Sequence, residues 1–235
     1  YSTHGYKKYK MRKFEEYDFY SENKDFLASE GIITFTDADG RLLALKPDVT
    51  LSILKNFKEE KGCVKRLYYN ENVYRISETS HTYQEIMQTG LECMGDIGSA
   101  ETCEVALLAL QSLALISEDY VLDLAHAGLL FALLDAYGLQ GEARKRAERA
   151  LNEKNEDALR AACTDAQFAI LANLIRSGSD NADTLRAIKK ICRDADAEAA
   201  FAELAALYTA LEEAGYAQHI RIDFSVVDAA AYYSG

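Results

Sequence analysis

A long block of helix-forming sequence, enclosed between two strand-forming segments, limits the folds that this chain can adopt. From about Gly128 to Gly215 the chain is rich in Ala, Leu, Glu, Lys and Arg, and its apolar residues recur at helical spacing, so about five helices are expected there. Strand character precedes the block and returns at His219–Val226. An all-helical block between strands predicts an α+β sheet domain that carries a helical insertion.

The part of the chain before about residue 98 is rich in β-formers, aromatic residues and turn signals. Apolar runs at 32–36 and 41–45 flank the turn sequence Asp37-Ala38-Asp39-Gly40, which predicts a hairpin. The other expected elements are a helix over 48–58, strands over 64–69, 73–77 and 83–94, a helix over 100–116 and a strand over 120–125.

Composition narrows the classes of function. The formal net charge is −12, whereas a protein that grips nucleic acid usually needs a basic face to neutralise phosphates, so tRNA or DNA is not expected as the main partner. The five cysteines are scattered along the chain, which predicts reduced thiols in the cytoplasm. The four histidines lie far apart and form no metal-binding motif, so no metal site is expected. No run of 18 apolar residues and no secretory signal is visible, and both ends read as cuts within a longer protein.

The expected strand around Gly90 carries the most informative polar pattern. Because side chains alternate between the faces of a strand, Gln88 and Glu92 point the same way, and Gly90 between them leaves room above the sheet. A small ligand with donor groups could sit there between an amide and a carboxylate. The opposite face, with Met87, Thr89, Leu91 and Cys93, is the expected packing face. The alternative for the face with Gln88 and Glu92 is plain exposure to solvent.

Three further segments carry candidate groups, each with a structural alternative. Asp48 and Thr50 follow Pro47 at a helix start, where they could hold an ammonium group or simply cap the helix. Arg75 could reach a carboxylate or phosphate, or lie exposed on a strand edge. The paired tyrosines Tyr232 and Tyr233 could line a pocket or belong to the core and a turn.

Taken together and in order, these segments resemble the catalytic domain of histidyl-tRNA synthetases and their paralogues. The segment 46–50 (Lys-Pro-Asp-Val-Thr) is similar to the family's Arg-Pro-Glu-Gly-Thr, whose acid and threonine hold the α-amino group of the substrate. The segment 68–75 is similar to the first half of class II motif 2, whose arginine contacts the substrate carboxylate and the ATP phosphate. The segment 88–92 matches Gln-x-Gly-x-Glu, whose Gln and Glu help to bind histidine, and 232–235 resembles the end of the histidine-specific motif.

The resemblance covers essentially the whole chain and implies a fold, a domain organisation and a site. The fold is a class II synthetase-like antiparallel sheet flanked by helices, with residues 1–127 as its first part, 128–217 as the helical insertion and 218–235 as the return to the sheet domain before motif 3. No catalytic residue, metal or cofactor is expected, and histidine is the expected regulatory ligand. The implied histidine-binding residues are Asp48, Thr50, Arg75, Gln88, Glu92, Tyr232 and Tyr233.

Departures from the family pattern fall on the nucleotide half of the site. Asp228 stands where the enzymes carry a catalytic arginine, and the motif 2 loop at 79–84 lacks the family's arginines. Activation of an amino acid by ATP develops negative charge on phosphate, which a fixed cation stabilises. A carboxylate in that place removes the stabilisation and adds repulsion, so the pattern favours a histidine sensor over an enzyme.

Among the paralogues, the regulatory subunits of ATP phosphoribosyltransferase match this pattern best. The resemblance implies a cytoplasmic, non-catalytic subunit with a short-form catalytic subunit as its partner, a homodimer through the synthetase-like domain, and a role in histidine feedback on the first step of histidine biosynthesis. Two alternatives stay open at this point. One is a divergent histidyl-tRNA synthetase that activates histidine with ATP and charges tRNA, and the other is a synthetase-like binding module with a different partner.

Overall fold

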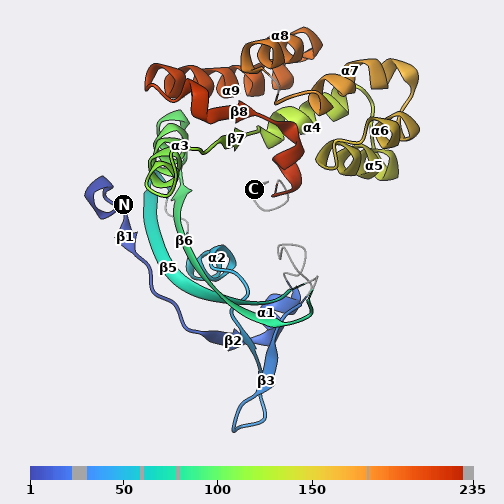
Figure 1. The fold of residues 1–235 in the computed structure, drawn as a ribbon. Helices are drawn as coiled ribbons and strands as arrows, with labels where there is room; N and C mark the ends of the chain where they lie inside the picture. Colours follow the sequence, from blue (N-terminus) through green and yellow to red (C-terminus); the bar gives the residue numbers. More distant parts are fainter. Residues whose placement is uncertain (23–30, 59–60, 78–79, 179, 230–235) are drawn as a thin grey trace. The chain divides into compact units, whose positions relative to one another are not determined.

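The computed structural model describes residues 1–22, 31–58, 61–77, 80–178 and 180–229, with side chains described as far as Val227 in the last range. It divides the chain into two compact units, Tyr1–Glu101 and Thr102–Gly235, which are described separately (Figure 1). The boundaries expected at residues 127 and 217 stay predictions. The helical block that they enclose lies within the second unit.

The first unit is built on a long antiparallel strand pair, β5 (Val64–Ile76) and β6 (Tyr83–Gly95), with β1 (Lys7–Lys8) parallel to β5. Two strands were expected where β5 runs without interruption, so that prediction was wrong. The polar residues 70–72 are poor strand formers, but the register pairs every residue from Val64 to Ile76 with β6. Tertiary pairing thus overrides the local preference.

A second small sheet has the order β2-β4-β3, with β2 at Phe14–Glu16, β3 at Thr34–Thr36 and β4 at Leu42–Leu45. The hairpin predicted between β3 and β4 is confirmed. Its turn is closed by Asp37, whose carboxylate accepts hydrogen bonds from the backbone N–H groups of Asp39 and Arg41, both at 2.9 Å. Gly40 has a φ of 81°, a conformation that glycine adopts without strain.

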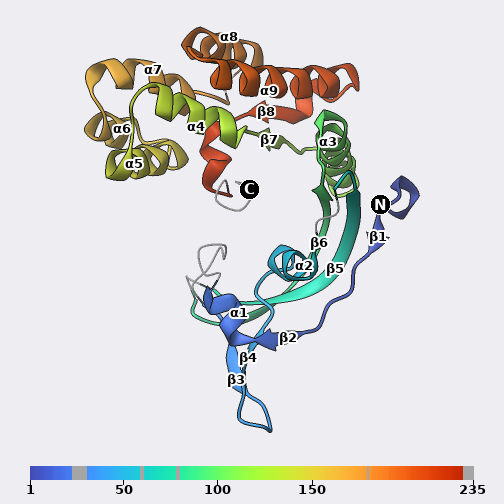
Figure 2. The same ribbon diagram turned by 180° about the vertical axis from the view of Figure 1, so that it is seen from behind.

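Two short helices pack in this unit, α1 (Tyr17–Glu22) and α2 (Thr50–Asn56), the latter shorter than the helix expected over 48–58. Val49 and Ile53 from the α2 segment are almost fully buried against Tyr69 and Val73 of β5. One face of the β5–β6 pair is therefore covered by α2, which lies along the curved strands in both ribbon views (Figures 1 and 2).

Helix α3 (Ser99–Ala114) leads into the second unit, where β7 (Leu122–Leu124) and β8 (Ile220–Ile222) pair in parallel. The strand expected over His219–Val226 is correct only in its first half. After Asp223 the backbone turns into the 3-10 helix η4 (Phe224–Ala229), because the Asp223 carboxylate accepts from the backbone N–H of Ser225 at 3.0 Å. Short 3-10 turns also occur at η1 (Ser2–His4) and η3 (Ala217–His219).

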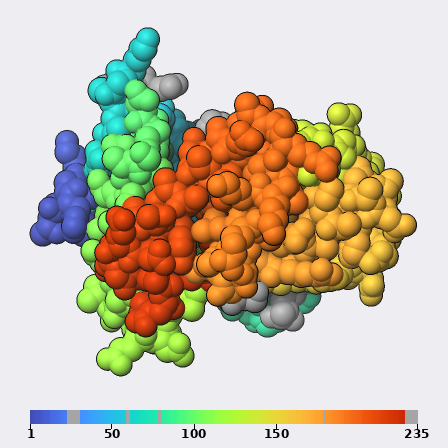
Figure 3. Space-filling view, turned by 90° about the horizontal axis from the view of Figure 1, so that it is seen from above, coloured from blue at the N-terminus to red at the C-terminus, as the bar shows by residue number. Residues whose placement is uncertain are grey.

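The described part of the insertion contains six helices where about five were expected. In the space-filling view, the atoms of much of this block, yellow to orange, lie in contact with one another (Figure 3). The missed breaks precede α6 and α9, where the side chains of Asn155 and Asp194 accept hydrogen bonds from backbone N–H groups three residues on. The helices are α4 (Ala127–Ala136), α5 (Gly141–Asn152), α6 (Glu156–Ala162), α7 (Asp165–Ile175), α8 (Asn181–Ile191) and α9 (Ala195–Glu213).

Leucines from these helices form the largest apolar core among the described residues, and Phe224 and Val227 of η4 belong to it. The segment that leads to Asp228 is therefore anchored on the insertion. Within the described residues, no helix is both long and apolar enough to cross a membrane.

Candidate functional site

Five of the seven predicted site residues come together in the first unit, on the face of the β5–β6 pair that α2 covers. The register aligns Gly90 with Tyr69, Gln88 with Glu71, and Gln84 with Arg75. Since alternate residues of a strand share a face, Arg75 of β5 projects to the same side as Gln88 and Glu92 of β6. Asp48 and Thr50 approach this face from the start of α2.

Glu92 is the most buried acid of this cluster, with 8% of its surface exposed. The Thr50 hydroxyl donates a hydrogen bond to its Oε1 atom. Burial raises the pKa of the Glu92 carboxyl above its ordinary value, the negative charge of Asp48 raises it further, and the bond from Thr50 opposes part of this rise. The site thus contains a carboxyl group that water solvates poorly.

The burial of the two faces of β6 corrects the expectation made from alternation alone. Met87, expected on the packed face, is 70% exposed, whereas Glu92 on the opposite face is buried. The reason is that α2 and the segment before it cover the Glu92 face. A strand's own sequence cannot say which of its faces another element will cover.

Gln88 lies on the same face of β6 as Glu92, on the other side of Gly90, and the Tyr69 hydroxyl lies beside it. The Gln88 amide nitrogen donates to the Tyr69 hydroxyl at 3.4 Å, while Gln88 Oε1 is buried and has no hydrogen-bond partner among the described residues. The room expected above Gly90 is filled by Tyr69, because a Cβ atom placed on Gly90 would lie 2.5 Å from the Tyr69 ring carbon Cζ. Glycine is thus required at position 90 by the close approach of the ring.

Asp48 and Arg75 hold the start of α2. Asp48 Oδ1 accepts the backbone N–H of Leu51 at 2.9 Å, so the capping interpretation is correct for Asp48. Arg75 donates through Nε to the Pro47 carbonyl at 2.9 Å, and its guanidinium lies 3.8 Å from Asp48 Oδ2. Thr50 does not cap the helix, since its hydroxyl turns to Glu92.

An ion pair that was not predicted completes the cluster. Lys46 is only 1% exposed, and its ammonium group lies 2.8 Å from Glu71 Oε2. Glu71 shares a face with Arg75 and is aligned with Gln88. The signal was present in the alternation of residues 71, 73 and 75, but splitting β5 at 70–72 hid it.

The remaining predicted residues, Tyr232 and Tyr233, lie outside the described residues, as does the side chain of Asp228. Their place in the site stays a prediction. In the described segments, no group of three or more His, Cys, Asp or Glu side chains is arranged to hold a metal ion.

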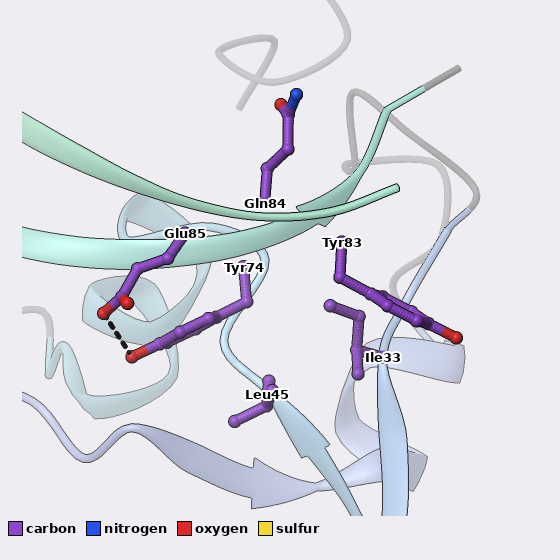
Figure 4. A pocket seen from close by; sticks show the side chains of 6 residues that line it. All are labelled: Ile33, Leu45, Tyr74, Tyr83, Gln84 and Glu85. Atoms are coloured by element: carbon purple, nitrogen blue, oxygen red, sulfur yellow. Dashed lines mark hydrogen bonds between the residues drawn. The ribbon is translucent and has the colours of Figure 1, made fainter. Parts of the chain in front are cut away.

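A hollow of about 270 Å³ lies elsewhere in the first unit and contains none of the predicted residues. Figure 4 shows Tyr74 and Tyr83 facing Ile33 and Leu45, with Gln84 directed away from them. Glu85 accepts a hydrogen bond from the Tyr74 hydroxyl at 3.0 Å. The hollow is mainly apolar and lies on the side of the sheet opposite Glu92, so it is distinct from the polar cluster.

Comparison with known proteins gives concordant results. A relative named ATP phosphoribosyltransferase regulatory subunit, from Bacillus mycoides (strain KBAB4), is 24% identical over 243 residues, which cover 98% of this chain and 57% of the relative. The chain thus spans little more than half the length of this relative.

Two solved structures share the fold. One is described as an ATP phosphoribosyltransferase regulatory subunit/histidyl-tRNA synthetase from Bacillus halodurans, with a TM-score of 0.80, 24% identity, and coverage of 96% of this chain and 61% of the other. The second is an ATP phosphoribosyl transferase (HisG:HisZ) complex from Thermotoga maritima, with a TM-score of 0.72, 16% identity, and coverage of 96% and 77%. The sequence model of the family described as histidyl-tRNA synthetase matches residues 1–235. With this match over its whole length, the chain belongs to the histidyl-tRNA synthetase family.

Proposed function

We propose that the protein represented by this chain is a regulatory subunit of ATP phosphoribosyltransferase that binds histidine without activating it. The observation that carries the proposal is the assembled polar cluster of Thr50, Gln88 and Glu92 on the sheet. It keeps the groups that the resemblance associates with histidine, while Asp228 replaces the cation that nucleotide chemistry requires. The relative from Bacillus mycoides carries the name of such a regulatory subunit.

The charge at position 228 argues against amino-acid activation. Loss of one fixed donor at a developing oxyanion costs about 3 kcal/mol, or roughly a hundredfold in rate. A carboxylate at the same position adds repulsion between like charges, so the effect on the rate is larger than that of simple removal. The residues that bind the amino acid do not need this cation. A protein that lacks the cation can therefore still bind histidine although it cannot activate it.

The partner in this proposal is a short-form ATP phosphoribosyltransferase catalytic subunit. The support is the fold shared with the Thermotoga maritima complex. Histidine that binds one assembly state more tightly than the other shifts the equilibrium toward that state, which gives feedback by linkage. A homodimer and a cytoplasmic location complete the proposal.

A mixing experiment with the full-length protein tests this function. We expect a short-form catalytic subunit to condense ATP with phosphoribosyl pyrophosphate faster when the protein is added, and histidine to reduce that rate. We also expect no histidine-dependent exchange between ATP and pyrophosphate. Exchange activity without any effect on the catalytic subunit would instead favour a divergent synthetase.

The site assignment has its own test, by calorimetric titration with histidine. Gln88→Ala and Glu92→Ala are each expected to weaken binding by about tenfold or more, because a hydrogen bond to a charged group contributes roughly 1.5–3 kcal/mol. Thr89→Ala, on the exposed opposite face of β6, is the matched control and should bind as the unmodified protein does. Unchanged affinity in both site variants would show that histidine binds elsewhere.

A further inference from the structure

The charged side chains of the described polar cluster form two ion pairs, and Glu92 belongs to neither of them. Lys46 pairs with Glu71 at 2.8 Å, and Arg75 lies 3.8 Å from Asp48. Glu92 receives a hydrogen bond from the Thr50 hydroxyl, and no Lys, Arg or His of the described segments forms an ion pair with it. When Glu92 is ionised, the cluster therefore carries one negative charge in excess.

The surroundings of Glu92 offer this charge little compensation. From the α2 segment it meets Asp48, which is itself negative, and the neutral hydroxyl of Thr50. Further along the same face, Tyr69 of β5 and Gln88 of β6 add only a phenol and a neutral amide. A buried carboxylate of this kind is costly unless a cation approaches it, and the described residues supply none.

We propose that this site binds its ligand together with a proton, and that a ring nitrogen of the ligand becomes cationic against Glu92 in the complex. The inference rests on the proposed function, which supplies histidine as the ligand. An imidazole has an unperturbed pKa near 6.5, so at about pH 7.5 it is mostly neutral in water and must gain a proton to become the counter-ion. The α-ammonium group of free histidine is already charged, so pairing it with Glu92 would require no proton.

Proton uptake is measured by calorimetric titration of the full-length protein with histidine in phosphate and in Tris, two buffers that differ in their enthalpy of ionisation. At about pH 7.5 we expect uptake of close to one proton per histidine, declining as the pH falls through the pKa of the imidazole. Glu92→Gln is expected to take up almost none and to bind at least about tenfold more weakly.

A matched control is available on the same strand. Glu85→Gln makes the same chemical change on the opposite face of β6, where Glu85 accepts a hydrogen bond from Tyr74. It is expected to leave both the proton count and the affinity unchanged. If Glu92→Gln binds too weakly for a proton count, nitrogen NMR of labelled histidine bound to the unmodified protein decides, with both ring nitrogens expected to be protonated.

The outcomes separate this inference from the proposed function. Histidine binding without proton uptake overturns the inference and leaves the function intact. Failure of histidine to bind also overturns the inference. The regulatory function is then judged by the separate mixing experiment, which measures activation of the catalytic subunit.

Discussion

Gly90→Ala is expected to destabilise the first unit through a steric conflict with Tyr69. The added Cβ atom would lie 2.5 Å from Tyr69 Cζ and 3.1 Å from Cε1, closer than carbon atoms pack. Tyr69 is 4% exposed and packs with Val49, Ile53 and Val73, so a shift of its ring would disturb this buried cluster.

The expected magnitude follows from two opposing effects. Overpacking in a filled core costs about 1–3 kcal/mol. Replacement of a glycine lowers the entropy of the unfolded chain and returns about 0.4–1 kcal/mol. The net loss of about 1–2 kcal/mol corresponds to a fall in Tm of roughly 2–8 °C for a chain of this size.

Urea denaturation and thermal melting, followed by circular dichroism, measure this loss. Thr89→Ala next to Gly90, on the exposed face, is the matched control and should be close to neutral. In a Tyr69→Leu background, which removes the atoms that clash, Gly90→Ala should cost little, so the two changes are expected to be strongly non-additive. A Gly90→Ala variant that is as stable as the unmodified protein would refute the steric argument.

The remaining predictions concern the charged groups and one helix cap. Lys46→Met should lower the free energy of unfolding by about 1–3 kcal/mol, because it leaves the partly buried Glu71 without its cation. The double variant Lys46→Met/Glu71→Leu should recover most of this loss in urea titrations. Equal stability of the single and double variants would contradict the pairing. Glu92→Gln should be more stable than the unmodified protein at neutral pH, because the raised pKa of Glu92 means that the folded state favours the protonated form. This advantage should shrink as the pH falls toward the ordinary value of 4.5, and a difference independent of pH would argue against a buried ionisable group. Asp194→Ala, which removes the N-cap of α9, should lower the free energy of unfolding by about 1 kcal/mol. The control Asp196→Ala, in the first turn of the same helix, should lower it by only a few tenths of a kcal/mol. Equal losses would show that the capping hydrogen bond adds no stability of its own.

The local elements were predictable where a short-range signal exists. The turn at Asp37–Gly40 was found because its residues satisfy their hydrogen bonds within the turn itself. The two missed helix breaks at Asn155 and Asp194 carry the same kind of signal, an N-cap side chain, so a closer search for caps would have found them. Strand β5 was split at residues 70–72 because the β6 residues that pair with them, at 87–89, lie more than ten residues further along the chain.

The sequence by itself determined the family pattern, the alternation that places Gln88 and Glu92 on one face, and the acid at position 228, because these depend only on residue identity and spacing. The tertiary structure alone decided which face of β6 is buried, that Tyr69 fills the space over Gly90, and that Asp48 and Arg75 hold the start of α2 while Lys46 neutralises Glu71. The physical reason is that burial and ion pairing depend on which distant segment covers a surface. The charge left on Glu92 is therefore a property of the assembled fold.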